Sequence, residues 1–239
     1  MGEDRMTQTP ILIGCAHGTA STEGQAVVRQ IIEDVRVAMP DVDVREAYVD
    51  VHGPFLDDVI AEIPVSEEGL TAVVVPLLLA SGYHVYHDIA TAVGSRPDVV
   101  SADALGPDSR LVDIVLDRLR EAHVPAEATL VLAAAGSSDP RSAADTEAAA
   151  EMLRGAWGGP VRVGFAAGHE PSVADAVAQA HEFGEDGVVA VASFLLAPGV
   201  FQKRLGEAGA DYVTGPLAPH PDLVSIVAER YGALTHGQH

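Results

Sequence analysis

The sequence predicts an α/β fold made of two similar, doubly wound parallel-sheet domains that arose by internal duplication. Two observations lead to this prediction. Short apolar runs rich in β-branched residues alternate with longer amphipathic stretches, an order typical of parallel sheets covered by helices. The same order then begins again about half-way along the chain of 239 residues, with nearly constant spacing between matching segments.

The first half is expected to hold four strands and the helices between them. The first helix should begin at Thr22 and Gln25, which have capping-box spacing, and stop at Pro40. The third strand should end at Pro76, because proline cannot donate to a central ladder. The expected strands are residues 11–15, 42–49, 71–75 and 99–105, and two further helices are expected at 54–63 and 109–121.

The second half repeats this order, with strands expected at residues 130–134, 161–167, 187–192 and 211–214. Three separated blocks keep nearly the same register between the halves: 17–19 with 135–137, 48–54 with 165–171, and 77–82 with 194–199. This repeat predicts two domains, residues 8–124 and 128–235, with their boundary in the polar stretch 123–128.

Composition and charge exclude several classes of protein. A formal net charge of −21 makes binding to nucleic acid or to an anionic membrane surface unexpected. The single cysteine, Cys15, excludes a disulfide framework and a cysteine-bound iron–sulfur cluster. The longest apolar run, 71–80, is too short to cross a bilayer, and the first ten residues do not resemble a signal peptide. We therefore expect a cytoplasmic protein.

Ionisable side chains gather after the strands of the first half, where open parallel sheets bind their ligands. His17 follows the first strand, Asp50 the second, and His84 lies beyond the third. Two imidazoles and a carboxylate suit a divalent transition metal ion or proton transfer near neutral pH. The matching positions of the second half are Ala135, Ala167 and Phe201. The pattern therefore predicts one such site, in the first half.

Asp50, and a further histidine close to His84, have more than one interpretation. Asp50 is equally suited to cap the helix expected near Pro54. His87 follows His84 by three residues, so it either shares a helical face with His84 or belongs to a solvated face. The sequence leaves open whether Asp50 or His87 contacts a metal ion.

Small residues follow the first strand of each half, at Gly18 and at Gly136 with Ser137. Such loops expose backbone N–H groups that favour anions, although tight-turn geometry alone also explains them. Arg141, just beyond, can add a guanidinium fork for a carboxylate. Neither loop has the glycine spacing of a phosphate-binding or dinucleotide-binding motif, so no nucleotide is expected.

Three segments resemble the sirohydrochlorin chelatase family, also called the CbiX/SirB family of class II chelatases. Residues 14–19, GCAHGT, resemble its H-G-S/T loop, and 47–54, AYVDVHGP, are similar to its A-F/Y-L-E-x-x-x-P segment. Residues 76–89, PLLLASGYHVYHDI, resemble its block P-L-hydrophobic-L-x-x-G-x-H-x-x-x-D-I/L, which is the most specific of the three. The resemblance covers residues from about 11 to 231 as a two-copy form.

The resemblance implies an enzyme, a lyase that inserts a divalent metal ion into sirohydrochlorin without ATP. It assigns the family's two metal-binding catalytic histidines to His17 and His84 and its carboxylate to Asp50, one methylene shorter than glutamate. The metal ion is a substrate, and this residue set accepts Fe²⁺, Co²⁺ and also Ni²⁺. The physiological metal, and with it the siroheme or cobalamin pathway, stays open.

The implied substrate carries eight carboxylates, so a strongly acidic chain needs a cleft that is locally positive or rich in N–H groups. The second half supplies two cationic side chains for this purpose, Arg141 and Lys203. We therefore predict that the second copy kept substrate binding and lost the chemistry. The residues expected to bind the tetrapyrrole are Gly18, Thr19, Gly82, Gly136, Ser137, Arg141 and Lys203.

Two alternatives compete with this interpretation. A non-catalytic carrier of metal ions or tetrapyrroles would need the same ligands. A histidine-type phosphatase would need an arginine before His17, where this chain has Ala16. The oligomeric state also stays open between a monomer and a homodimer, because the two halves of one chain can face each other.

Overall fold

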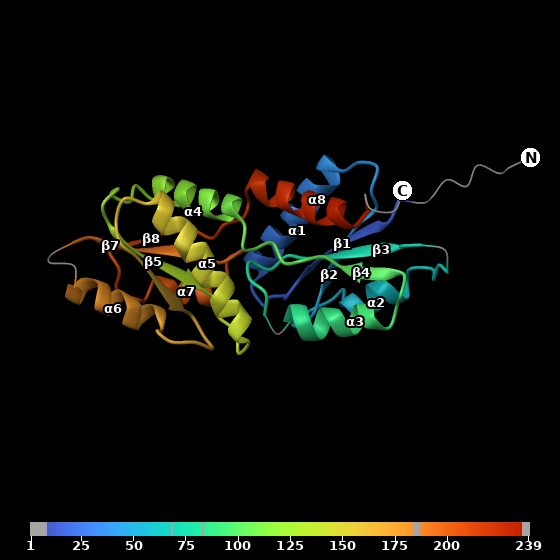
Figure 1. Cartoon of the computed structure of the whole chain (residues 1–239), viewed down its shortest axis with the longest axis horizontal. Helices are drawn as coiled ribbons and strands as arrows, with labels where there is room; N and C mark the ends of the chain where they lie inside the picture. The colour runs from blue at the N-terminus through green and yellow to red at the C-terminus, as the bar shows by residue number, and fades with distance from the viewer. Residues whose placement is uncertain (1–8, 68, 83, 184–186, 236–239) are drawn as a thin grey trace, which may run out of the picture.

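The computed structural model of the chain describes residues 9–67, 69–82, 84–183 and 187–235. Two lobes lie end to end, each built around a four-stranded parallel sheet (Figure 1). In the first lobe, β1 (Ile11–Ala16) pairs with β2 (Val44–Tyr48) and β3 (Ala72–Pro76), and β4 (Val99–Ser101) joins β3. The strand order is therefore β2-β1-β3-β4.

The second lobe repeats this topology. Its strands are β5 (Thr129–Ala134), β6 (Val161–Phe165), β7 (Val189–Phe194) and β8 (Tyr212–Val213), all parallel, in the order β6-β5-β7-β8. The same order in both sheets confirms the predicted α/β class and the internal duplication. The fourth strands, β4 and β8, are shorter than the sequence suggested, and β7 runs on to Phe194.

Pro76 ends β3, as its missing N–H requires. The backbone N–H of the next residue, Leu77, still donates to the carbonyl of Cys15 at 2.7 Å. The loop beyond β3 is therefore fixed to the end of β1 from its first residue.

Helices cover both faces of each sheet. The expected capping box at Thr22 and Gln25 was wrong. Ser21 caps the helix instead, accepting from the Gly24 N–H at 3.2 Å, while the Gln25 side chain donates to the carbonyl of Thr19. The helices are α1 (Thr22–Ala38), α2 (Leu56–Ala61), the π-helical turn η1 (His84–Ile89), α3 (Ala90–Gly94), α4 (Ser109–Glu121), α5 (Pro140–Ala156), α6 (Val173–Phe183), α7 (Val200–Leu205) and α8 (Pro221–Thr235).

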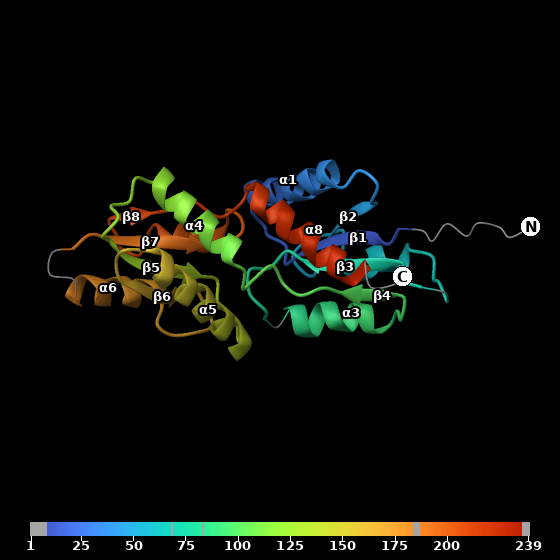
Figure 2. The same cartoon turned by 45° about the horizontal axis from the view of Figure 1, so that its top comes forward.

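The last helix of each repeat packs on the lobe of the other repeat. Helix α4 crosses to the second lobe and contacts α5 and β7, and α8 crosses back and contacts α1 and β3 (Figures 1 and 2). Each lobe in space therefore contains a helix from the other repeat, and the ranges 8–124 and 128–235 stay a prediction of the repeat boundaries in the sequence. The largest buried apolar cluster accordingly runs through both lobes, from Leu12 to Tyr231.

An arginine holds each of the two crossing segments. Arg118 of α4 donates to three backbone carbonyls of the segment 216–219, at 2.9, 2.8 and 2.7 Å. Arg230 of α8 donates to two carbonyls of the segment 104–105, at 3.0 and 3.2 Å. The side chains of Arg118 and Arg230 are 13% and 20% exposed, so both guanidinium groups are largely shielded from water. Each arginine thus ties its exchanged helix to a segment of the repeat on whose lobe that helix packs.

Replacing Arg118 by alanine should therefore weaken the fold. Three carbonyls would lose a charged donor, and we expect the free energy of unfolding to fall by about 2 kcal/mol in urea titrations. Arg120→Ala is the matched control on the same helix, because its side chain is 71% exposed and pairs with Asp117 at the surface. Equal stability of the two variants would contradict this role of Arg118.

Within the part of the chain that the structure describes, no helix is long and apolar enough to cross a membrane.

Candidate active site

A cavity of about 600 Å³ lies between the two lobes. Its walls come from the residues that follow β1 and β3 in the first lobe and β5 and β7 in the second. The carboxyl edges of the two sheets therefore face each other across it. This is where ligands bind in open parallel sheets, and the duplication doubles that edge around one space.

Apolar and small side chains dominate the cavity wall, including Leu77, Leu79, Phe194 and Leu196. Hydroxyls, amides and backbone groups supply the polar positions. A flat, largely apolar molecule fits such a lining, because a few placed polar groups then set its orientation.

His17 lines the cavity directly after β1 and is half-buried. Its Nδ1 lies 3.2 Å from the carbonyl oxygen of Gly18, and its own carbonyl accepts from the Asp50 N–H at 3.0 Å. Gly18 has φ +99°, and a Cβ there would lie 2.2 Å from the Asp50 carbonyl oxygen. Only glycine permits this turn, so Gly18 fixes where His17 enters the cavity.

Asp50 lies on an exposed loop next to His17 in space, but it is not among the described residues that line the cavity. Its Oδ1 accepts from the Val51 N–H at 2.7 Å. The proposed capping role for Asp50 was wrong: α2 begins after Phe55, and within the described residues no side chain caps it. Val51 has φ +68°, a strained conformation for a β-branched residue.

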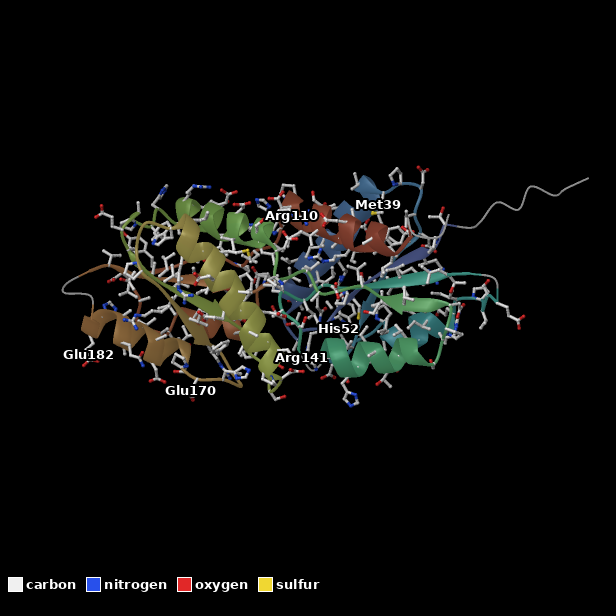
Figure 3. All side chains as sticks on the ribbon, viewed as in Figure 1. Met39, His52, Arg110, Arg141, Glu170 and Glu182 are labelled. Carbon is white, nitrogen blue, oxygen red and sulfur yellow. The ribbon has the colours of Figure 1, made fainter. Side chains whose placement is uncertain are left out.

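His52, labelled in Figure 3, follows on the same loop. Its ring packs 4.0 Å from the ring of Tyr48, and its Nδ1 lies 3.0 Å from the carbonyl oxygen of Gly53. Burial is the largest cause that raises the pKa of Tyr48 to about 12, followed by Glu46. This pair packs at the end of β2 and does not line the cavity in the described part of the chain.

The side chain of His84 lies outside the described residues. Its backbone begins η1, and the loop that leads to it lines the cavity through Leu79, Ala80 and Gly82. We predict that the side chains of His17 and His84 lie within about 8 Å of each other, a separation that one bound metal ion can bridge. Among the described side chains, no group of three or more histidine, cysteine, aspartate or glutamate residues could hold a metal ion, so the proposed site depends on His84.

The second lobe copies the turn of the first without its histidine. Gly136 has φ +80°, and a Cβ there would lie 1.8 Å from the Ala167 carbonyl oxygen. This repeats the close approach of Gly18 to the carbonyl oxygen of Asp50 in the first lobe. Gly136 and Ser137 line the cavity, as Thr19 does on the opposite side. Phe201, at the position that matches His84, also lines it and is 37% exposed.

Arg141 and Lys203 lie apart from these residues. Figure 3 shows Arg141 near the boundary between the lobes, where its guanidinium binds Asp139 at 2.6 and 3.0 Å. That hydrogen bond lowers the pKa of Asp139 to about 2. Lys203 is exposed on α7. Neither cation is among the described residues that line the cavity, so any role in binding must lie at its rim.

Among the residues that line the cavity and were not predicted, three are polar side chains on helices: Ser142 and Thr146 of α5, and Gln202 of α7. Gln202 is fixed by Ser193 and by the carbonyl of Thr214, at 2.7 and 2.8 Å. No sequence signal marked them, because a helical face that lines a cavity between lobes has the same periodicity as one that packs on a sheet.

The family was tested by comparison with known proteins. A model of the CbiX family matches residues 11–122 and again 129–234. The chain belongs to the CbiX family. The double match agrees with the repeat in the sequence, and it confirms the resemblance to the CbiX/SirB class II chelatases.

Relatives of this CbiX-family chain bear consistent names. A sirohydrochlorin ferrochelatase from Priestia megaterium is 28% identical over 149 residues, which cover 58% of this chain and 55% of that relative. A sirohydrochlorin cobaltochelatase from Sulfolobus acidocaldarius is 28% identical over 109 residues, which cover 44% of this chain and 86% of that protein. The match thus spans about half the length of the first relative and most of the second.

Solved structures share the fold. SirB from Bacillus subtilis, determined with Fe³⁺, superposes with a TM-score of 0.79 at 20% identity. The superposition covers 96% of this chain and 98% of SirB, so both lobes and their relative placement match.

Proposed function

We propose that this CbiX-family chain inserts a divalent metal ion, Fe²⁺ or Co²⁺, into sirohydrochlorin without a nucleotide. One observation carries the proposal: the two sheets face each other across a cavity whose wall holds His17 on one side and Ala135 at the matching position on the other. The names of the two relatives, a ferrochelatase and a cobaltochelatase, support the same reaction. Ni²⁺ also suits imidazole ligands, so it is a third candidate substrate.

Metal insertion requires three events: partial dehydration of the metal ion, its delivery to one face of the ring, and removal of two pyrrole protons. In our proposal His17 and His84 bind the metal ion and leave positions open for exchange. A neutral imidazole also accepts a proton near neutral pH. The backbone N–H of Asp50 donates a hydrogen bond to the carbonyl of His17, and the Asp50 side chain would supply a carboxylate near the two histidines.

The tetrapyrrole ring would occupy the apolar interior of the cavity, because its macrocycle is flat and largely apolar. Its carboxylates would then point to the rim, where burial of charge is not needed. Gly18, Thr19 and Gly82 on one side, with Gly136 and Ser137 on the other, offer backbone N–H groups and hydroxyls. Arg141 and Lys203 lie outside these residues and are proposed to attract the acid groups at the rim.

Replacing Arg141 or Lys203 by alanine should raise KM for sirohydrochlorin more than it lowers kcat, because rim contacts act in ground and transition states alike. We expect about a 10-fold effect for each variant, smaller at high salt because both side chains are exposed. Steady-state kinetics at two ionic strengths measure this. Arg120→Ala, at the surface of α4, is the control for loss of one positive charge. Unchanged KM in both variants would show that the second lobe does not hold the acid groups of the tetrapyrrole through Arg141 or Lys203.

The reaction itself is tested by timing anaerobic insertion of Fe²⁺ or Co²⁺ into sirohydrochlorin with and without the protein. A chelatase accelerates the insertion with turnover, and the rate does not change when ATP is added. A carrier would bind both ligands and leave the rate at its uncatalysed value.

A further inference from the structure

We propose that Asp145, on α5 of the second lobe, is a positioning residue for the loop that carries His84. The inference deepens the proposed function and rests on it, since it concerns a histidine proposed to bind the metal ion. It assigns the second repeat a specific part in the chemistry of the first.

The contact that carries the inference crosses between the lobes. The backbone N–H of Ser81 donates to Oδ2 of Asp145 at 2.7 Å. Ser81 stands three residues before His84, within the loop that forms part of the cavity wall. Both residues are half-buried, so water competes only weakly for this hydrogen bond. A carboxylate acceptor also makes the bond about twice as strong as a neutral pair would.

The neighbouring residue, Gly82, packs against the same part of the second lobe. A Cβ on Gly82 would lie 3.2 Å from the Ser137 Oγ and 3.9 Å from the Ser142 Cβ. Two consecutive residues of the loop thus contact the β5–α5 corner, one through a charged hydrogen bond and one through close packing. The position of the loop depends on the second lobe as well as on β3.

The matching contact on the other side of the molecule has lost the hydrogen bond. In the register of the repeats, Pro198 stands at the position of Ser81, and Val27 of α1 at the position of Asp145. Proline has no N–H to donate and valine has no acceptor. The helix still approaches the loop there, since a Cβ on Gly24 would lie 2.3 Å from the Pro198 carbonyl oxygen. Both repeats therefore share the packing of a helix against this loop. The hydrogen bond to a carboxylate is found at the loop that leads to His84 and is absent from the matching loop, where Pro198 has no N–H.

This difference matters because metal coordination is sensitive to small displacements. An imidazole must approach its metal ion to about 2.1 Å, and misplacement by about 1 Å can cost two orders of magnitude in rate. A bond to the backbone three residues before His84 limits such displacement without placing a further charge on the metal ion itself. Asp145 would thereby act through His84 and not on the substrate.

Four variants test the role of Asp145. Asp145→Ala removes the acceptor, Asp145→Asn keeps an acceptor oxygen without the charge, and Ser81→Pro removes the donor by introducing the residue of the second repeat. Glu151→Ala is the matched control, a carboxylate on the same helix that is 75% exposed and paired with Arg154. Titration with Co²⁺ alone, followed by visible absorption, reports metal binding; hydrogen exchange of residues 77–84 reports the order of the loop.

We expect Asp145→Ala and Ser81→Pro each to weaken Co²⁺ binding and kcat by about 10-fold, with KM for sirohydrochlorin changed by less than about 2-fold. Asp145→Asn should retain most of the function and Glu151→Ala all of it. Exchange over residues 77–84 should be faster in Asp145→Ala. In a double variant that combines Asp145→Ala with Ser81→Pro, the two effects should not add, because each substitution removes the same hydrogen bond.

Wild-type Co²⁺ affinity and wild-type exchange in Asp145→Ala would overturn the proposal, as would fully additive effects in the double variant. If Asp145→Ala does not fold, Asp145→Asn and Ser81→Pro decide by the same readouts. Failure of the proposed function has a separate signature: the wild-type protein would then bind Co²⁺ without accelerating its insertion, while the exchange measurement would still report on the anchor.

Discussion

Replacing either His17 or His84 by alanine should lower the rate of metal insertion by at least about 100-fold, the scale expected for loss of a metal ligand or a proton acceptor. His17 lines the cavity between the lobes from the loop after β1, and the loop before His84, which follows the neighbouring strand β3, lines the same first-lobe side. Folding should survive both changes, because both residues follow strand ends, where loops tolerate substitution.

The measurement is the initial rate of Fe²⁺ or Co²⁺ insertion, with circular dichroism to confirm that each variant is folded. His123→Ala is the control, since His123 is exposed in the turn after α4 and is not among the described residues that line the cavity. Near wild-type insertion by His84→Ala would remove the basis for a two-histidine centre and favour the carrier.

Replacing Asp98 by alanine should lower the free energy of unfolding by roughly 3–5 kcal/mol, the usual cost of breaking a buried ion pair. The Asp98 side chain is 2% exposed and the Arg96 side chain 12%. Arg96 donates to both carboxylate oxygens at 2.8 Å, and the Ser66 N–H and Thr71 hydroxyl donate at 3.0 and 2.8 Å. Without the carboxylate, a nearly buried guanidinium and two further donors lose their charged acceptor, and Arg96 keeps only backbone carbonyls such as those of Ile60 and Ile63.

The same carboxylate predicts how stability depends on pH. The hydrogen bond from Arg96 is the largest cause that holds the pKa of Asp98 well below its ordinary value. A group with a lowered pKa stabilises the fold above its unfolded pKa of about 3.9, and this contribution is lost as the pH falls toward the folded value.

Urea titrations at pH 7 and below pH 4 measure both effects. Asp98→Ala should reduce stability strongly at pH 7, and its deficit should shrink as the pH falls below about 4. Asp43→Ala is the control, since Asp43 is 54% exposed and its pair with Arg45 should contribute at most about 1 kcal/mol. A deficit that is the same at every pH would contradict the assignment of the effect to the charged pair.

The doubly wound fold and its duplication could be predicted from the sequence because both depend on local pattern. Strands such as β1 and β5 are short apolar runs in matching register, and no distant contact is needed to recognise them. The exchange of α4 and α8 could not be predicted. An amphipathic helix shows that it has an apolar face, but not which of two similar sheets that face will cover.

The site divides in the same way. His17 and Gly18 could be placed at the cavity from their position after the first strand, because ligands bind at that edge of a parallel sheet. Asp145 gave no signal, because its partner is a backbone N–H in the other lobe and the matching position of the first repeat is Val27, which has no acceptor. The capping interpretation of Asp50 failed because Pro54 precedes the helix by two residues and the chain turns there first.

Anomalous diffraction from crystals of this protein soaked with Co²⁺ tests the central claim most directly. One active centre formed by the first repeat predicts a strong peak about 2.1 Å from imidazole nitrogens of both His17 and His84. It predicts none at the matching place beside Ala135 and Phe201. A cobalt peak away from these two histidines, or comparable cobalt peaks in both lobes, would contradict a single centre at this cavity wall.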